Sequence, residues 1–109
     1  STETWVYGNA SGSTPFSKTR FIYSAGNVLI PSILDDLKKA GKATLLVEGG
    51  ANVLHQFLEA GYWDEIRVLS SKYRLGQGVM APQIPGNRVI LREQFNIGND
   101  QVSIFTRSF

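Results

Sequence analysis

The residue types and patterns that the sequence lacks exclude several classes of protein. It contains no cysteine, which excludes disulfide bonds, thiolate metal sites and a cysteine nucleophile. Its single histidine, His55, argues against a metal site built from several histidines. No apolar run approaches the roughly 20 residues that span a bilayer, and the N-terminus has no signal-peptide pattern. We therefore expect a cytoplasmic protein with no membrane segment and no metal site.

The sequence also has only a small excess of positive over negative charge. Eleven Lys and Arg against nine Asp and Glu give a net charge of +2, and no basic block is longer than Lys38-Lys39. Proteins that bind nucleic acid usually carry a basic patch or stripe, so we expect no nucleic-acid partner. With 109 residues, of which 42% are hydrophobic, the chain is long enough for one globular domain with a small core.

In the first half of the chain, two segments with strand-like composition are followed by one with helical spacing of its apolar residues. Residues 4–7 and 20–23 are rich in aromatic and β-branched side chains, which predicts two short strands, with an exposed loop at 11–17 between them. An apolar stripe with helical spacing then predicts a helix over 31–40 that ends at Gly41. The stripe consists of Ile30, Ile33, Leu34 and Leu37.

In the middle of the chain, a strand-like segment is again followed by a segment with helical spacing. Residues 43–47 form a continuous apolar run without alternation, as in a central strand covered on both faces. Glu48-Gly49-Gly50 ends the run, and a second apolar stripe predicts a helix that Gly61 closes. Helix, strand and helix in close succession predict parallel pairing through right-handed crossovers. The second stripe consists of Val53, Leu54, Phe57 and Leu58.

The last part of the chain is dominated by strand patterns. Residues 66–69 predict a strong strand, 75–79 a glycine loop, and 88–95 a half-exposed strand. After a turn at 96–100, residues 101–107 are expected to pair back as an antiparallel hairpin. The predicted fold is therefore α/β, with a mixed sheet that ends in an antiparallel C-terminal hairpin.

The turn at Glu48-Gly49-Gly50 is the strongest candidate for chemistry. A strand that enters a helix through two glycines brings bare backbone N–H groups to the helix N-terminus, where the helix dipole also favours an anion such as phosphate. Glu48 would lie at the carboxyl end of the strand, where ligands bind in open α/β sheets. The alternative is that the glycines only turn the chain and that Glu48 is a solvated loop residue. The G-x-G-x-x-G dinucleotide motif is absent.

Two further groups of residues are candidates for ligand contact. Asn52, His55 and Gln56 lie on the first two turns of the predicted helix, away from its apolar stripe, and either reach a ligand or form a solvated polar face. Gly76 and Gly78 follow a predicted strand and either form a second backbone cradle or belong to a simple turn.

Several motifs in fixed order resemble a known family. They are residues 45–54 (LLVEGGANVL), Phe57-Leu58, Asp64-Glu65-Ile66 and Leu75-Gly76-Gln77-Gly78. Together they resemble the C-terminal reductase domain of the bacterial bifunctional riboflavin-biosynthesis enzyme, the pyrimidine deaminase/uracil reductase. The helix and strand pattern over 29–47 and the terminal hairpin extend the resemblance.

The resemblance implies a dihydrofolate-reductase-like fold, a three-layer α/β/α architecture with a mixed, mostly parallel sheet. Residues 1–109 would be the C-terminal portion of a single, longer reductase domain. The family uses NADPH to reduce 5-amino-6-(5-phosphoribosylamino)uracil at its ribose by hydride transfer. The zinc of these enzymes belongs to a deaminase domain that these residues do not contain. Members of the family form homodimers.

The resemblance also implies roles for individual residues. Glu48 matches the glutamate that binds the substrate's pyrimidine. The cofactor-binding stretch corresponds to Gly50, Ala51, Asn52, Val53, Leu54, His55 and Gln56, to which the backbone argument adds Gly49, Gly76 and Gly78. Because the first half of the family's domain has no counterpart here, we expect these 109 residues alone to be inactive. Two alternatives are a non-catalytic nucleotide-binding or assembly module of the same fold, and a related reductase acting on a pterin-like substrate.

Overall fold

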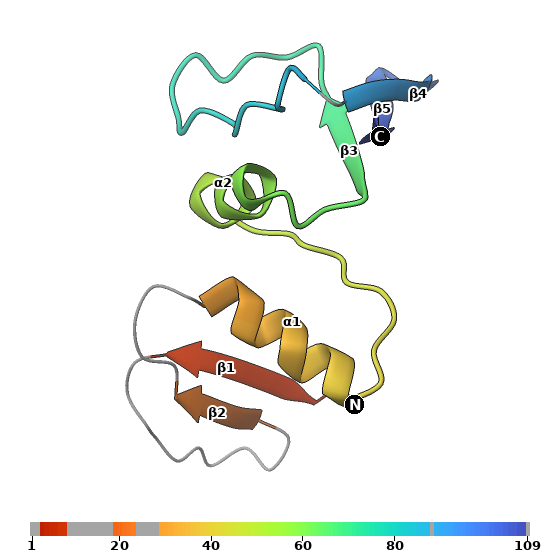
Figure 1. The fold of residues 1–109 in the computed structure, drawn as a ribbon. Coiled ribbons are helices and arrows are strands. Elements are labelled where there is room, and N and C mark those ends of the chain that lie inside the picture. Colours follow the sequence, from red (N-terminus) through yellow and green to blue (C-terminus); the bar gives the residue numbers. More distant parts are fainter. Residues whose placement is uncertain (1–2, 9–18, 24–28, 88, 109) are drawn as a thin grey trace. The chain divides into compact units, whose positions relative to one another are not determined.

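The structure, a computed structural model, describes residues 3–8, 19–23, 29–87 and 89–108. The expected loop at 11–17 and residue Arg88 lie outside these ranges. The chain divides into two compact units, Ser1–Leu46 and Val47–Phe109, which are described separately below. Figure 1 labels their helices and strands.

The first unit contains a small parallel sheet. Strand β1 (Thr4–Gly8) pairs with β2 (Thr19–Tyr23), from Thr4 opposite Thr19 to Gly8 opposite Tyr23. Both strands were predicted from the aromatic and β-branched composition, and both predictions are confirmed.

Helix α1 (Leu29–Lys39) completes the elements of the first unit. The predicted helix is confirmed, although it begins two residues before Pro31. It ends in a Schellman motif, in which Gly41 has a φ of 78° and the N–H of Lys42 donates to the carbonyl of Leu37. Ile30, the first residue of the apolar stripe, is buried.

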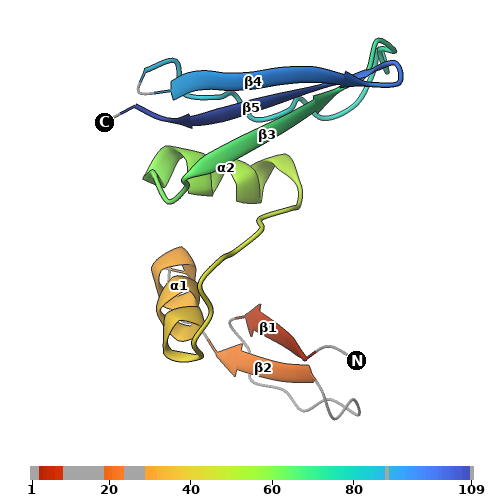
Figure 2. The same cartoon turned by 90° about the vertical axis from the view of Figure 1, so that its right-hand side faces the viewer.

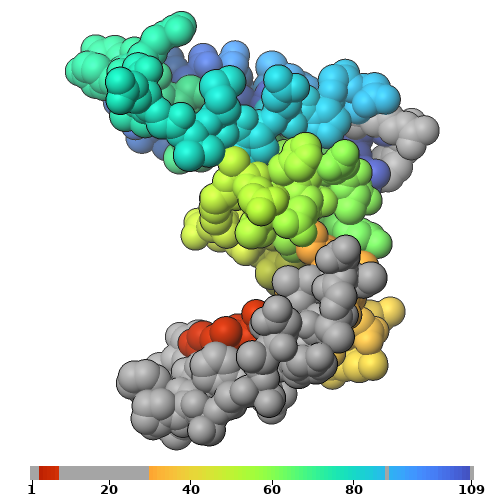
Figure 3. Space-filling view, turned by 90° about the vertical axis from the view of Figure 1, so that its left-hand side faces the viewer, coloured from red at the N-terminus to blue at the C-terminus, as the bar shows by residue number. Residues whose placement is uncertain are grey.

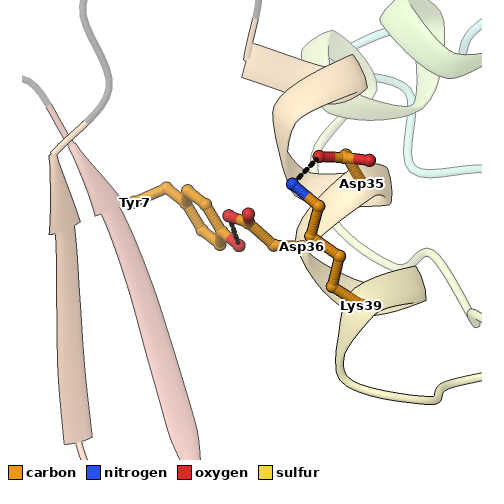
Figure 4. Close-up of polar contacts among 4 residues, drawn as sticks. All are labelled: Tyr7, Asp35, Asp36 and Lys39. Atoms are coloured by element: carbon orange, nitrogen blue, oxygen red, sulfur yellow. Dashed lines mark hydrogen bonds and ion pairs between the residues drawn. The ribbon is translucent and has the colours of Figure 1, made fainter.

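Polar contacts link β1 to α1 and stabilise the helix surface (Figure 4). The Tyr7 hydroxyl donates to Asp36 Oδ2 over 2.9 Å, which joins the strand to the helix. One turn apart on the helix surface, Lys39 Nζ lies 2.8 Å from Asp35 Oδ2. The hydrogen bond and the negative charge of Asp35 raise the pKa of Lys39 above its ordinary value. Because both side chains are exposed, solvent screens the pair and its contribution to stability is small.

The second unit contains a three-stranded antiparallel sheet in the order β3-β5-β4, shown lengthwise in Figure 2. The strands are β3 (Glu65–Ser70), β4 (Val89–Ile97) and β5 (Asp100–Arg107). The predicted hairpin of β4 and β5 is confirmed. It closes with Ile97 opposite Asp100, leaving the two-residue loop Gly98-Asn99. Gly98 has a φ of 59°, which suits the tight turns that match strand twist.

Helix α2 (Ala51–Ala60) precedes this sheet and, as predicted, ends at Gly61. Phe57 is its buried residue, only 7% exposed. Gly61 has a φ of 78°, and the N–H of Tyr62 donates to the carbonyl of Phe57, so α2 also ends in a Schellman motif. On β5 the buried residues are Val102 and Ser103. The core of this unit is therefore small.

The predicted strand at 43–47 is wrong. In the structure this segment has no strand partner and lies mostly exposed, with Leu46 80% accessible to solvent. A buried central strand needs a neighbouring strand on each side to satisfy its backbone N–H and C=O groups. The part of the chain that the structure describes supplies no such neighbours, because β3 pairs with β5 instead.

The class of the fold is confirmed as mixed α/β, with a small antiparallel sheet at its C-terminal end. The predicted parallel pairing around the second helix is wrong, since β3 is antiparallel to its partner β5. Within the described residues, parallel pairing occurs only between β1 and β2. Apart from the strand predicted at 43–47, period and spacing correctly distinguished helices from strands, but they did not identify which strands pair.

Candidate functional site

The N-terminus of α2 is the centre of the candidate site. Gly50 is its N-cap, with φ −71° and ψ 167°, and no side-chain capping hydrogen bond is found among the described residues. The carbonyl of Gly50 accepts the first helical hydrogen bond, from the N–H of Leu54, over 3.3 Å. The N–H groups of the first turn have no acceptor within the helix, and the helix dipole adds partial positive charge there. An anion is the ligand that such an end accommodates best.

The two glycines before the helix have different backbone conformations. Gly49 has a φ of 155°, a conformation that residues with a Cβ rarely adopt. Gly50 has ordinary extended geometry, and a Cβ placed on it would meet no atom within 4 Å. Gly49 is therefore required by the backbone, whereas a Cβ at Gly50 would be accommodated without a close contact.

Glu48 immediately precedes this glycine pair. Its side chain is exposed, and among the residues that the structure describes its carboxylate has no hydrogen-bond or ion-pair partner. A free carboxylate accepts hydrogen bonds from the N–H donors of a ligand. The geometry therefore leaves the Glu48 carboxylate available to a ligand.

The polar residues predicted on α2 form an exposed face, opposite the buried Phe57. The Gln56 side-chain amide donates to Asn52 Oδ1 over 3.2 Å, and His55 Nε2 lies 2.9 Å from Glu59 Oε2. Glu59 was missed as a partner of His55, although its i,i+4 spacing is visible in the sequence. Because these pairs are exposed, ligand binding can replace them at low cost.

The apolar positions at the start of α2 are less buried than their stripe predicts. Val53 is 45% exposed, while Ala51 and Leu54 are half-buried. They therefore present apolar surface close to the helix N-terminus, where it is available to a ligand.

The loop after β3 begins at the same end of this unit as α2. The short connection at 61–64 reverses the chain, so β3 runs back along the helix and its C-terminal end lies near the start of α2, as Figure 2 shows. In this loop Gly76 has a φ of 75° and Gly78 a φ of 141°. The topology thus places the start of the loop that contains the second glycine segment at the end of the unit where α2 begins.

Sequence reasoning missed Arg107, which connects the sheet to the opposite end of α2. Its guanidinium donates to the carbonyl of Gly61 over 2.7 Å and to that of Trp63 over 3.4 Å. It also lies 5.4 Å from the centre of the Trp63 ring, within cation–π range. Carbonyls at a helix C-terminus attract cations, so Arg107 helps hold α2 against the sheet.

Neither a metal centre nor a membrane span is found within the ranges that the structure describes. No three His, Cys, Asp or Glu side chains come together in a group that could hold a metal ion. No helix there is long and apolar enough to cross a bilayer.

These features define a class of protein, a mixed α/β chain in which a glycine turn leads into a helix N-terminus whose first-turn N–H groups have no acceptor within the helix. Comparison with known families identifies the particular one. Residues 2–103 match the RibD C-terminal domain, which is almost the whole chain. The chain therefore belongs to the RibD C-terminal domain family, as its motifs suggested.

Two individual proteins similar to this chain are informative. One is a curated relative, riboflavin biosynthesis protein RibD of Bacillus amyloliquefaciens, 32% identical over 89 residues, covering 74% of this chain and 24% of that protein. The other is a crystal structure of a "putative riboflavin biosynthesis protein" from Shewanella sp. PV-4, with a TM-score of 0.71 and 17% identity. That alignment covers 98% of this chain and 61% of the Shewanella chain, and it supports the fold. The chain spans about a quarter of the length of the curated relative.

Proposed function

We propose that this chain forms the C-terminal portion of an NADPH-dependent reductase domain of riboflavin biosynthesis. The reaction is reduction of 5-amino-6-(5-phosphoribosylamino)uracil to its ribitylamino product by hydride transfer. The observation that carries the proposal is the uncapped N-terminus of α2, directly after the free carboxylate of Glu48, in a chain of the RibD C-terminal domain family.

The geometry at α2 fits a dinucleotide cofactor. The absence of any atom within 4 Å of a Cβ placed on Gly50, and the unsatisfied N–H groups of the first turn, support a phosphate contact there. The half-buried Ala51 and Leu54 and the exposed Val53 supply apolar surface beside it. When bound, the nicotinamide supplies the hydride, and the residues of this chain bind and orient it. The cofactor-binding residues proposed are Gly49, Gly50, Ala51, Asn52, Val53, Leu54, His55, Gln56, Gly76 and Gly78.

In this proposal Glu48 orients the substrate. Its carboxylate accepts hydrogen bonds from the N–H donors of the pyrimidine, so that the sugar faces the cofactor. A charge-assisted hydrogen bond of this kind fixes both position and orientation, because the acceptor is strong and directional. Glu48 transfers no proton in this scheme.

The proposal extends to the context of the chain. The full reductase domain would complete a three-layer, dihydrofolate-reductase-like sheet with strands contributed by residues outside this chain. Such strands would give residues 43–47 the neighbours that they lack here. The enzyme would be a cytoplasmic homodimer, and zinc would be confined to a separate deaminase domain.

Kinetics of the full-length protein test the role of Glu48. We expect Glu48→Gln to lower kcat/KM for the phosphoribosylaminouracil by about ten- to a hundredfold, because a charged acceptor is lost from the pyrimidine. Oxidation of NADPH, followed by its absorbance, is the measurement. Glu93→Gln is the matched control, since Glu93 is an exposed carboxylate on β4, and it should leave kcat/KM unchanged.

Other outcomes separate the alternatives. Near wild-type kinetics for Glu48→Gln would refute the role of this residue in substrate binding. Tight NADPH binding without turnover of any pyrimidine would indicate a non-catalytic nucleotide-binding module. Turnover of a pterin-like compound in preference to the aminouracil would indicate a related reductase with another substrate.

A further inference from the structure

Cationic residues are unevenly distributed along the chain. Residues 66–92 contain five of the eleven Lys and Arg and none of the nine Asp and Glu. The rest of the chain contains six cationic and nine acidic residues and is therefore net negative. The small overall charge hides a cationic segment that begins in β3 and continues through the following loop, and such a segment raises the local concentration of anions.

Within the part of the chain that the structure describes, two of these cations have no protein acceptor. Arg67 forms an ion pair with Glu65, and Arg92 donates to the Thr106 hydroxyl. In contrast, Lys72 and Arg74 have no ion pair or hydrogen bond among the described residues, although Lys72 Nζ lies 5.4 Å from the centre of the Tyr73 ring. Both side chains are exposed. Their charges are therefore available to a ligand.

The backbone of the same loop also presents free donors. Within the described part of 71–87, the hydrogen bond found is from the Tyr73 N–H to the Ser71 hydroxyl. Gly76 and Gly78 have left-handed φ values, and their N–H groups have no protein acceptor there. In Figure 3 the teal segment that follows β3 lies on the surface next to the yellow-green segment that contains α2. The loop that carries these cations and backbone donors begins at the end of the unit where α2 starts.

We propose that Lys72 and Arg74, together with the N–H groups of Gly76 and Gly78, bind a phosphate monoester of the ligand held at the start of α2. This inference rests on the proposed function and goes beyond it by naming residues that select phosphorylated ligands. The phosphate belongs either to the adenosine ribose of NADPH or to the sugar of the substrate. The chemistry is the same in both cases, because two cations and backbone donors neutralise a dianion.

The test uses the double variant Lys72→Gln/Arg74→Gln in the full-length protein. Dissociation constants for NADPH and NADH are measured by nucleotide fluorescence, and KM is measured for the substrate and its dephosphorylated form. A phosphate site for the cofactor predicts about tenfold weaker binding of NADPH with NADH unchanged. A site for the substrate phosphate predicts a similar rise in KM for the phosphorylated substrate alone.

Lys38→Gln/Lys42→Gln is the matched control, because it removes the same charge from exposed positions in the other unit. It should change none of these constants. Equal losses in both double variants, or no loss in either, would overturn the inference, as would failure of the wild type to bind either nucleotide. If NADPH binds through Lys72 and Arg74 but no pyrimidine is reduced, the reductase proposal fails and the phosphate site stands.

Discussion

Gly49 and Gly50 are adjacent, but the structure places different demands on their backbones, so replacing each with alanine tests the geometry of the turn. Gly49 has a φ of 155°, whereas Gly50 has φ −71°. A Cβ on Gly49 would lie 3.8 Å from Val53 Cβ, an ordinary contact, so any cost at this position comes from the backbone and not from a clash.

The magnitudes follow from these conformations. Holding alanine at the φ of Gly49 destabilises the folded chain by about 1–3 kcal/mol. Alanine also lowers the conformational entropy of the unfolded chain, which stabilises the folded chain by about 0.4–1 kcal/mol. Gly49→Ala should therefore lower the free energy of unfolding by about 1–2 kcal/mol. At Gly50 alanine is a poorer N-cap than glycine by about half a kcal/mol. The same entropic gain offsets this loss, so Gly50→Ala should be nearly neutral.

Urea unfolding of the chain measures both variants. In a Trp5→Phe background, Trp63 is the remaining tryptophan, and its fluorescence reports on the second unit. With a urea dependence of about 1 kcal/mol per molar, typical of small proteins, Gly49→Ala should move the midpoint by about 1–2 M. Gly50→Ala should leave the midpoint within the error of the wild type.

A third variant connects the geometry to ligand binding. The hydroxyl of Gly50→Ser can accept from a first-turn N–H, which should stabilise the helix by a few tenths of a kcal/mol, ~0.3. The same hydroxyl would compete with a phosphate for these donors, so the affinity for NADPH should fall while stability rises. Equal destabilisation by alanine at Gly49 and Gly50 would refute the assigned backbone conformations. Unchanged NADPH affinity in Gly50→Ser would refute the anion site.

Two further predictions concern other contacts. Arg107→Ala removes donors from the carbonyls of Gly61 and Trp63, so we expect a loss of about 1–2 kcal/mol in urea unfolding and a changed Trp63 emission; wild-type stability would refute the bridging role. Asp35 raises the pKa of Lys39 in the folded chain. At pH values below the ordinary pKa of 10.5, the stabilisation by this pair is therefore fully present. It is lost as the pH rises through the pKa that Lys39 has in the folded chain. Circular dichroism should therefore show Lys39→Gln slightly less stable than the wild type at neutral pH, with the difference disappearing only above pH 10.5; a difference that persisted unchanged at higher pH would contradict the assignment.

Local features of the fold were predictable because neighbouring residues cause them. Helix α1 and helix α2 follow from apolar spacing and from Gly41 and Gly61, which terminate them through contacts within one turn. The hairpin of β4 and β5 likewise depends on a two-residue turn. The strand at 43–47 failed because a strand exists only when distant residues pair with it. Its composition was strand-like, but no partner is present within the described part of the chain.

The sequence by itself determined the helices, the hairpin, the glycine turn after Glu48 and the family to which the chain belongs. These depend on residue order and short-range geometry, which a sequence states directly. Only the tertiary structure decided that β3 pairs antiparallel with β5, that Arg107 bridges to the end of α2, and that the cationic loop begins at the end of its unit where α2 starts. Each of these features depends on contacts between residues far apart in the sequence. Such contacts form, and contribute to stability, only when the chain folds.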